Sequence, residues 1–61
     1  MTYIKKIRID NNLTRKEMAQ ILNINLDVYR GIERGDRVTS LKTIKILKGK
    51  FPKIDTNIFF K

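Results

Sequence analysis

The chain has 61 residues, a length that suits one small domain with a limited hydrophobic core. Fourteen lysines and arginines oppose six acidic residues, and the resulting formal net charge of +8 favours a polyanionic partner, with nucleic acid as the first candidate. Cysteine and histidine are both absent, so thiolate ligands and the usual general base are missing, and we expect no metal, no cofactor and no enzymatic activity.

Two helices are predicted in the first part of the chain. Ile4 and Ile7 share one face of a helix expected over residues 2–11, which ends at Asn12, a residue that tolerates left-handed backbone. A second helix near 15–21 follows from a T-x-x-E capping box, in which the first and fourth side chains each satisfy a backbone amide at the helix start. The box consists of Thr14 and Glu17, and the apolar stripe consists of Met18, Ile21 and Leu22.

A third helix is predicted over residues 26–34, separated from the second by a tight turn. Asn23 suits a positive φ in that turn, Asn25 is a favoured N-cap, and Gly35 ends the helix. Successive residues are rotated by about 100° around a helix axis. The outward face of this helix therefore carries Asp27, Arg30, Gly31 and Arg34, and the inward face carries Tyr29 and Ile32.

A fourth helix and a final turn complete the expected architecture, an all-α bundle of about five short helices in a single domain over 1–61. Ser40 is expected to cap the fourth helix, and Pro52 stops it. Its apolar positions are Leu41, Ile44, Leu47 and Phe51. Asp55 is expected to cap the final turn, which contains Ile58, Phe59 and Phe60. The expected core comprises Ile4, Ile7, Met18, Leu22, Ile24, Tyr29, Ile32, Leu41, Ile44 and Leu47.

The segments "LTRKEMAQILNI" and "YRGIERG" resemble the helix-turn-helix of the Cro/C1-type (XRE-like) regulators of phages and bacteria. The resemblance covers most of the chain and implies a lambda-repressor-like fold with its helix-turn-helix at about 15–34. Ala19 falls where the family keeps a small residue, and Asn23 stands where glycine usually makes the turn. Arg8 and Glu33 match an arginine and a glutamate that commonly form a structural ion pair between the first and third helices.

The resemblance also implies which side chains read bases. In the family these lie in the first positions of the third helix and one turn later, positions that here hold Leu26, Asp27, Val28, Arg30 and Gly31. Arg30 suits guanine, Asp27 suits the amine of cytosine, and an apolar side chain suits the methyl group of thymine. Gly31 would let the helix backbone or Arg30 lie closer to the bases. Alternatively, Asp27 only contributes a favourable charge in the first helical turn, and the side chains of Leu26 and Val28 bind a protein.

Contacts with the phosphate backbone are expected from basic and small polar side chains around the third helix. Arg15 matches a family position at the start of the second helix, where it acts together with free backbone amides. The expected set is Thr14, Arg15, Asn25, Arg34, Arg37, Thr39, Ser40 and Lys42. For the three residues at helix starts, Thr14, Asn25 and Ser40, capping is the first role and a phosphate contact the second.

The predicted function is sequence-specific binding of double-stranded operator DNA by a cytoplasmic, nucleoid-associated regulator of bacterial or phage origin, a Cro-like repressor that occludes a promoter. A two-fold operator requires a homodimer, at least on DNA. Within the C-terminal segment 52–61, the side chains available for a dimer contact, or alternatively for covering the core, are Ile54, Ile58, Phe59 and Phe60. We expect no small-molecule ligand, because the chain leaves no room for a sensing domain.

Two other functions are compatible with the sequence. The first is a protein-interaction helix-turn-helix of the antitoxin or anti-regulator type, with weak or no specific DNA binding. The second is nonspecific binding to DNA or to an anionic membrane surface through the lysines of the fourth helix. A membrane-spanning segment is not expected, because the longest apolar run has three residues and a span needs about 20.

Overall fold

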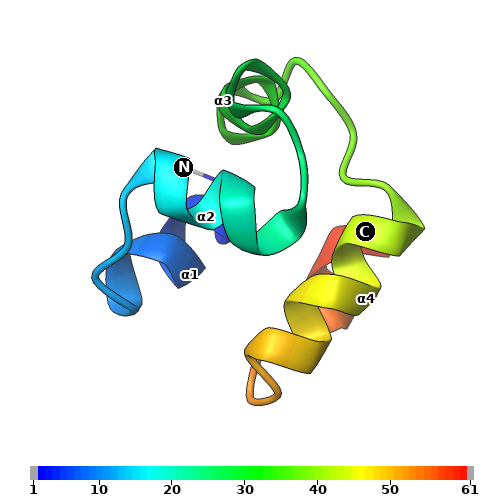
Figure 1. The fold of residues 1–61 in the computed structure, drawn as a ribbon. Helices are drawn as coiled ribbons and strands as arrows, with labels where there is room; N and C mark the ends of the chain where they lie inside the picture. The colour runs from blue at the N-terminus through cyan, green and yellow to red at the C-terminus, as the bar shows by residue number, and fades with distance from the viewer. Residues whose placement is uncertain (1, 61) are drawn as a thin grey trace.

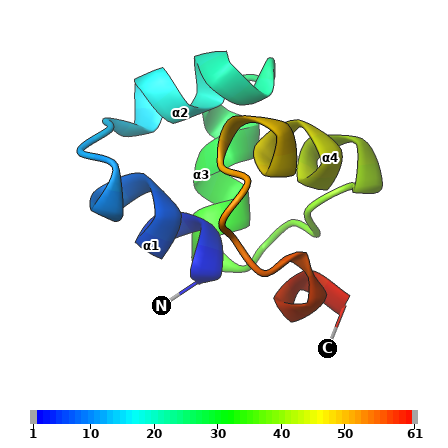
Figure 2. The same cartoon turned by 90° about the horizontal axis from the view of Figure 1, so that it is seen from below.

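The computed structural model describes residues 2–60, the last of them through its backbone only, and these residues form a helical bundle without strands. The elements are α1 (Tyr3–Asp10), α2 (Arg15–Leu22), α3 (Leu26–Arg34), α4 (Leu41–Lys50) and the 3-10 helix η1 (Thr56–Phe60). In Figure 1, α1 and α2 lie on the left, α4 lies on the right and α3 lies above them, and Figure 2 shows the same bundle from below, with η1 after α4 near the C-terminus. None of the helices in the described residues has the length and apolar character needed to cross a membrane.

The expected number of helices needs a correction. The bundle holds four α-helices, and the fifth element is a short 3-10 helix because so short a segment forms too few hydrogen bonds of the α type to favour that geometry. The first helix is also one residue shorter at each end than the expected range of 2–11. Asn12, with φ of 57°, has the left-handed conformation expected where the chain leaves α1.

The local signals around α2 and α3 are confirmed. Thr14 Oγ1 accepts a hydrogen bond from the amide of Glu17 at 3.1 Å, and Glu17 Oε1 accepts one from the amide of Thr14 at 2.9 Å. Asn23 ends α2 in the left-handed conformation, and the side chain of Asn25 caps α3. Gly35 ends α3 with φ of 87°, a backbone conformation that residues other than glycine rarely adopt.

The core lies where α1, α2, α3 and α4 meet, and most of it was predicted. Buried hydrophobic side chains are Ile4, Ile7, Met18, Ala19, Leu22, Tyr29, Ile32, Ile44 and Leu47, and Ile24 packs partly buried against them. Among the described elements, α2 and α3 make the most extensive contact. Ala19 is 3% exposed and belongs to the core cluster, so its small side chain lies on the buried face of α2.

The prediction that Leu41 belongs to the core is wrong, because this residue is 58% exposed. The buried face of α4 instead includes Thr43, Ile44 and Leu47. Leu41 is rotated by about 60° from Ile44 around the helix axis, on the side opposite to Thr43 and Leu47. The spacing of three residues was therefore right, but the core lies on the other side of Ile44.

Candidate nucleic-acid interface

Glu33, in the last turn of α3, holds three helices together. Its Oε2 accepts a hydrogen bond from Arg8 Nε on α1 at 2.7 Å and another from the hydroxyl of Tyr29, and its Oε1 accepts from Arg15 Nε on α2 at 3.1 Å. The Glu33 side chain is only 5% exposed and that of Arg8 is 10% exposed. Arg8 also donates to the carbonyl of Leu13, so the structure brings the expected Arg8 and Glu33 pair together and extends it into a larger network.

The protonation states in this network follow from its contacts. Burial alone would raise the pKa of Glu33, but hydrogen bonds from Arg8 and Tyr29 and the positive charge of Arg8 hold that pKa below its usual value. The hydrogen bond to Glu33 raises the pKa of Arg8. Burial, followed by the contact with Glu33, raises the pKa of Tyr29, so its hydroxyl stays protonated and donates a hydrogen bond to the carboxylate. At neutral pH the carboxylate is therefore ionised, and it accepts three hydrogen bonds from side chains.

We expect the free energy of unfolding to fall as the solution is made acidic. The folded-state pKa of Glu33 lies below its ordinary value of 4.5, so the stability that it contributes is complete above that pH and is lost as the pH falls through the folded-state pKa. Urea unfolding at a series of pH values on both sides of 4.5 measures this loss. Glu17→Gln should leave most of the pH dependence, because Glu17 is exposed and solvent screens its charge. A free energy that does not fall with acidification would contradict the assignment.

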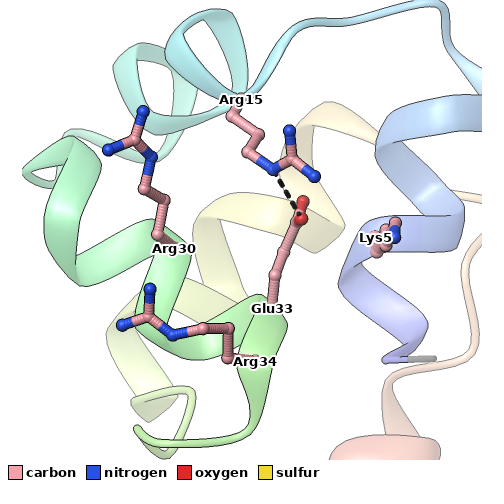
Figure 3. A pocket seen from close by; sticks show the side chains of 5 residues that line it. All are labelled: Lys5, Arg15, Arg30, Glu33 and Arg34. Carbon is pink, nitrogen blue, oxygen red and sulfur yellow. Dashed lines mark hydrogen bonds and ion pairs between the residues drawn. The ribbon is translucent and has the colours of Figure 1, made fainter.

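A basic hollow of about 310 Å³ opens beside this network, between α1, α2 and α3. It is lined by Lys5, Arg15, Arg30, Glu33 and Arg34, and Figure 3 shows these side chains. Arg15 is fixed at Nε by Glu33, and its two terminal nitrogens have no hydrogen-bond partner among the described residues. Because the one carboxylate is already bonded to Arg8, the hollow has an excess of positive charge. Such a surface suits a phosphate group.

The residues expected to read bases have different environments. Asp27 and Arg30 are both exposed and form an ion pair along α3, in which Arg30 Nη1 lies 3.8 Å from Asp27 Oδ1. Leu26 and Val28 are half-buried and pack against the core cluster, so each has a structural role as well as an exposed part.

Gly31 differs most from its expected environment. It was expected on the open outward face of α3, but it is buried, and the side chain of Arg37 covers it. A Cβ atom on Gly31 would lie only 2.9 Å from Arg37 Cδ. The reason is that a residue without a side chain leaves a groove in the helix surface, and the loop after α3 returns and fills that groove with Arg37.

The three residues at helix starts use their side chains as caps. Besides Thr14, Asn25 Oδ1 accepts from the amide of Asp27 at 2.7 Å, and Ser40 Oγ accepts from the amide of Thr43 at 3.2 Å. The caps keep α2, α3 and α4 starting at fixed residues. The cap oxygens are therefore engaged within the protein.

The other residues expected at phosphates lie in three places, and Arg37 lines the second of them together with Thr39. Arg15 and Arg34 line the basic hollow, and Arg34 Nε also lies 2.8 Å from Asp36 Oδ2. Thr39 is half-buried beside a second hollow between α1, the loop after α3 and η1. Lys42 is exposed at the start of α4.

Lys5 is the residue of the basic hollow that the sequence analysis missed. It lies on α1, three residues before Arg8, and residues three apart share a helix face. The resemblance placed Arg8 on the face of α1 that meets α3, so the spacing of three residues could have placed Lys5 on that face as well. Nothing else distinguished it from the other lysines of the chain.

The residues of the C-terminal segment divide between two environments. Ile54 and Phe59 are partly buried and pack against the core cluster, and the rings of Phe59 and Tyr3 lie 5.5 Å apart. Ile58 remains 37% exposed. The side chain of Phe60 lies outside the described part of the structure. Two of the four side chains expected at a dimer contact therefore cover the core.

One comparison with known proteins gives a match to this arrangement. The family model described as "Helix-turn-helix" matches residues 4–51, which run from the second residue of α1 through α4 and include the capping box, the turn at Asn23 and the pair of Arg8 and Glu33. No curated protein and no solved structure matches the chain.

Proposed function

Because the chain belongs to the helix-turn-helix family of Cro/C1-type (XRE-like) regulators, we propose that it binds double-stranded DNA at specific sequences and regulates transcription. The observation that carries the proposal is the basic hollow beside α3, which Lys5, Arg15 and Arg34 line from three helices. In this proposal the start of α3 enters the major groove, and a phosphate of the DNA backbone binds in the hollow. The net charge of +8 supports the same partner.

We further propose that the protein acts as a homodimer on DNA and represses by occluding a promoter. Two α3 helices would then meet half-sites about 34 Å apart on one face of the duplex. Exposed apolar side chains support a contact between copies, because Val38 is 93% exposed and Leu41 and Ile58 are also exposed. Sedimentation with and without operator DNA tests the dimer, and a single copy per operator would contradict it.

Selection of random duplex DNA by the purified protein, at near-physiological salt of about 0.15 M, tests the proposed function. We expect one enriched motif with two-fold symmetry and a fixed spacing between its halves. Retention without enrichment that vanishes as salt rises would instead indicate nonspecific binding. No retention at all would favour the protein-interaction function, expected to use Leu26, Val28 and the aromatic C-terminal segment.

Arg30→Ala is expected to relax specificity at one base pair of the selected motif. A guanidinium that bonds guanine contributes discrimination of roughly tenfold or more at that position, whereas affinity for unrelated DNA should change little. Binding to the motif and to its single-base variants measures the effect. Arg34→Ala is the matched control, since it removes the same charge one turn later on α3 and should weaken binding to all sequences. A uniform loss for Arg30→Ala would contradict its role as a base reader.

A further inference from the structure

Arg37 crosses the surface of α3 at the one helical position that has no side chain. A Cβ atom built on Gly31 would lie 2.9 Å from Arg37 Cδ, 3.0 Å from its Cγ and 3.2 Å from its Nε. These distances are shorter than ordinary van der Waals contact. The stem of Arg37 therefore occupies the space that any other residue at position 31 would fill.

The backbone after α3 delivers Arg37 to this place. Gly35 reverses the chain with φ of 87°, and the carbonyl of Gly31 then accepts hydrogen bonds from the amides of Asp36 at 2.9 Å and Arg37 at 3.3 Å. Both the main chain and the side chain of Arg37 are thus held against Gly31. This arrangement limits the directions in which the guanidinium can extend.

Arg37 differs from the other arginines because its charge has no partner within the described part of the chain. Arg8 and Arg15 bond to Glu33, Arg30 pairs with Asp27, and Arg34 pairs with Asp36. For Arg37, the part of the chain that the structure describes provides neither an ion pair nor a side-chain hydrogen bond. Arg37 is exposed, and its guanidinium donors are not used within the described part of the chain.

The position of Gly31 on α3 indicates which ligand Arg37 contacts. It is rotated by about 40° from Asp27 and about 60° from Arg34 around the helix axis, so it lies on the outward face that they share. We propose that Arg37 reads a base: it reaches across Gly31 and donates two hydrogen bonds to a guanine in the major groove. This inference rests on the proposed function, and it replaces the expectation that Arg37 contacts only phosphate.

Two substitutions test the proposal from opposite sides. Arg37→Ala removes the guanidinium, and Gly31→Ala keeps it but places a methyl group where the stem of Arg37 lies. Arg37 is a flexible side chain, so Gly31→Ala should displace it without unfolding the domain, and urea unfolding checks this. The matched controls are Gly49→Ala, at a glycine of α4 where an added Cβ would meet nothing within 4 Å, and Lys45→Ala, which removes a charge of the same sign from an exposed position of α4.

The readout is the affinity for the selected motif and for its single-base variants. Wild type should prefer guanine by roughly tenfold at one base pair, and Arg37→Ala should abolish this preference at that base pair only. Gly31→Ala should abolish the same preference, and the double variant should lose no more than either single variant. Both controls should keep the wild-type preference.

Three other outcomes overturn the inference. If Arg37→Ala weakens binding to all sequences equally and lowers the salt slope by about 0.9, Arg37 contacts phosphate. If Gly31→Ala keeps the preference that Arg37→Ala loses, the glycine does not position Arg37. If wild type selects a motif that Arg37→Ala reads equally well, Arg37 reads no base. In all three cases the proposed function stands, whereas a wild-type protein without any preferred sequence contradicts both proposals.

Discussion

Glu33→Gln is expected to lower the free energy of unfolding by about 3 kcal/mol or more, because it leaves the nearly buried guanidinium of Arg8 without its counter-charge. An amide has one acceptor atom and a donor group in place of two acceptor oxygens. At least one donor among Arg8, Arg15 and Tyr29 would then face another donor. In so small a domain this loss corresponds to a melting temperature lower by roughly 10 °C or more, measurable by thermal and urea unfolding.

The matched control is Asp36→Asn, which makes the same chemical change in an exposed ion pair. Arg34 Nε lies 2.8 Å from Asp36 Oδ2, but both side chains are 64% exposed. The change should therefore lower the free energy of unfolding by less than about 1 kcal/mol. The double variant Arg8→Met with Glu33→Gln should recover part of the stability lost in Glu33→Gln, because it no longer contains an uncompensated buried charge, and Arg15 is half exposed. Equal losses for Glu33→Gln and Asp36→Asn would contradict the importance of the network.

The elements of the fold that could be predicted are those with signals close together in the sequence. Thr14 and Glu17 cap each other within one helical turn, and Asn25 caps the helix that begins at the next residue. The left-handed residues Asn23 and Gly35 end helices through their own backbone conformations. Such signals act over a few residues and need no knowledge of the tertiary structure, so the bounds of α2 and α3 were predicted closely.

What could not be predicted depends on contacts between distant elements. The periodicity of α4 allowed two buried faces, and only the placement of α4 against the core decided that Leu41 is exposed. Rotation around α3 assigned Gly31 to the outward face, but it gave no information about the loop that returns with Arg37. Lys5 was missed for the same reason, because its role depends on how α1 lies beside α3.

Glu33 connects the stability of the fold to the geometry of the proposed interface. Through Arg8 it fixes α1, which carries Lys5, and through Arg15 it fixes the start of α2. The guanidinium of Arg15 is therefore held in place before any ligand binds, and the helix that carries Lys5 is fixed beside it. Preorganised charges lose less conformational entropy on binding than freely rotating ones, so their contribution to affinity is larger.

Arg15→Ala is consequently expected to weaken binding to every DNA sequence by about tenfold, the effect of losing one strong charge-assisted hydrogen bond. The slope of log affinity against log salt should decrease by about 0.9, corresponding to one phosphate contact. Affinity measured at several salt concentrations, for the selected motif and for unrelated DNA, tests both expectations. The fold should remain, because Arg15 is half exposed and Glu33 keeps its bonds to Arg8 and Tyr29.

Two further variants separate the position of Arg15 from its charge. Lys53→Ala removes an equal charge that does not line the basic hollow, so it should change the affinity much less. Arg15→Lys keeps the charge, but a single ammonium group cannot both bond Glu33 and present a separate planar set of donors to a phosphate. Its salt slope should match that of wild type while its affinity falls between those of wild type and Arg15→Ala. If Arg15→Lys binds as tightly as wild type, positioning by Glu33 contributes nothing and only the charge matters.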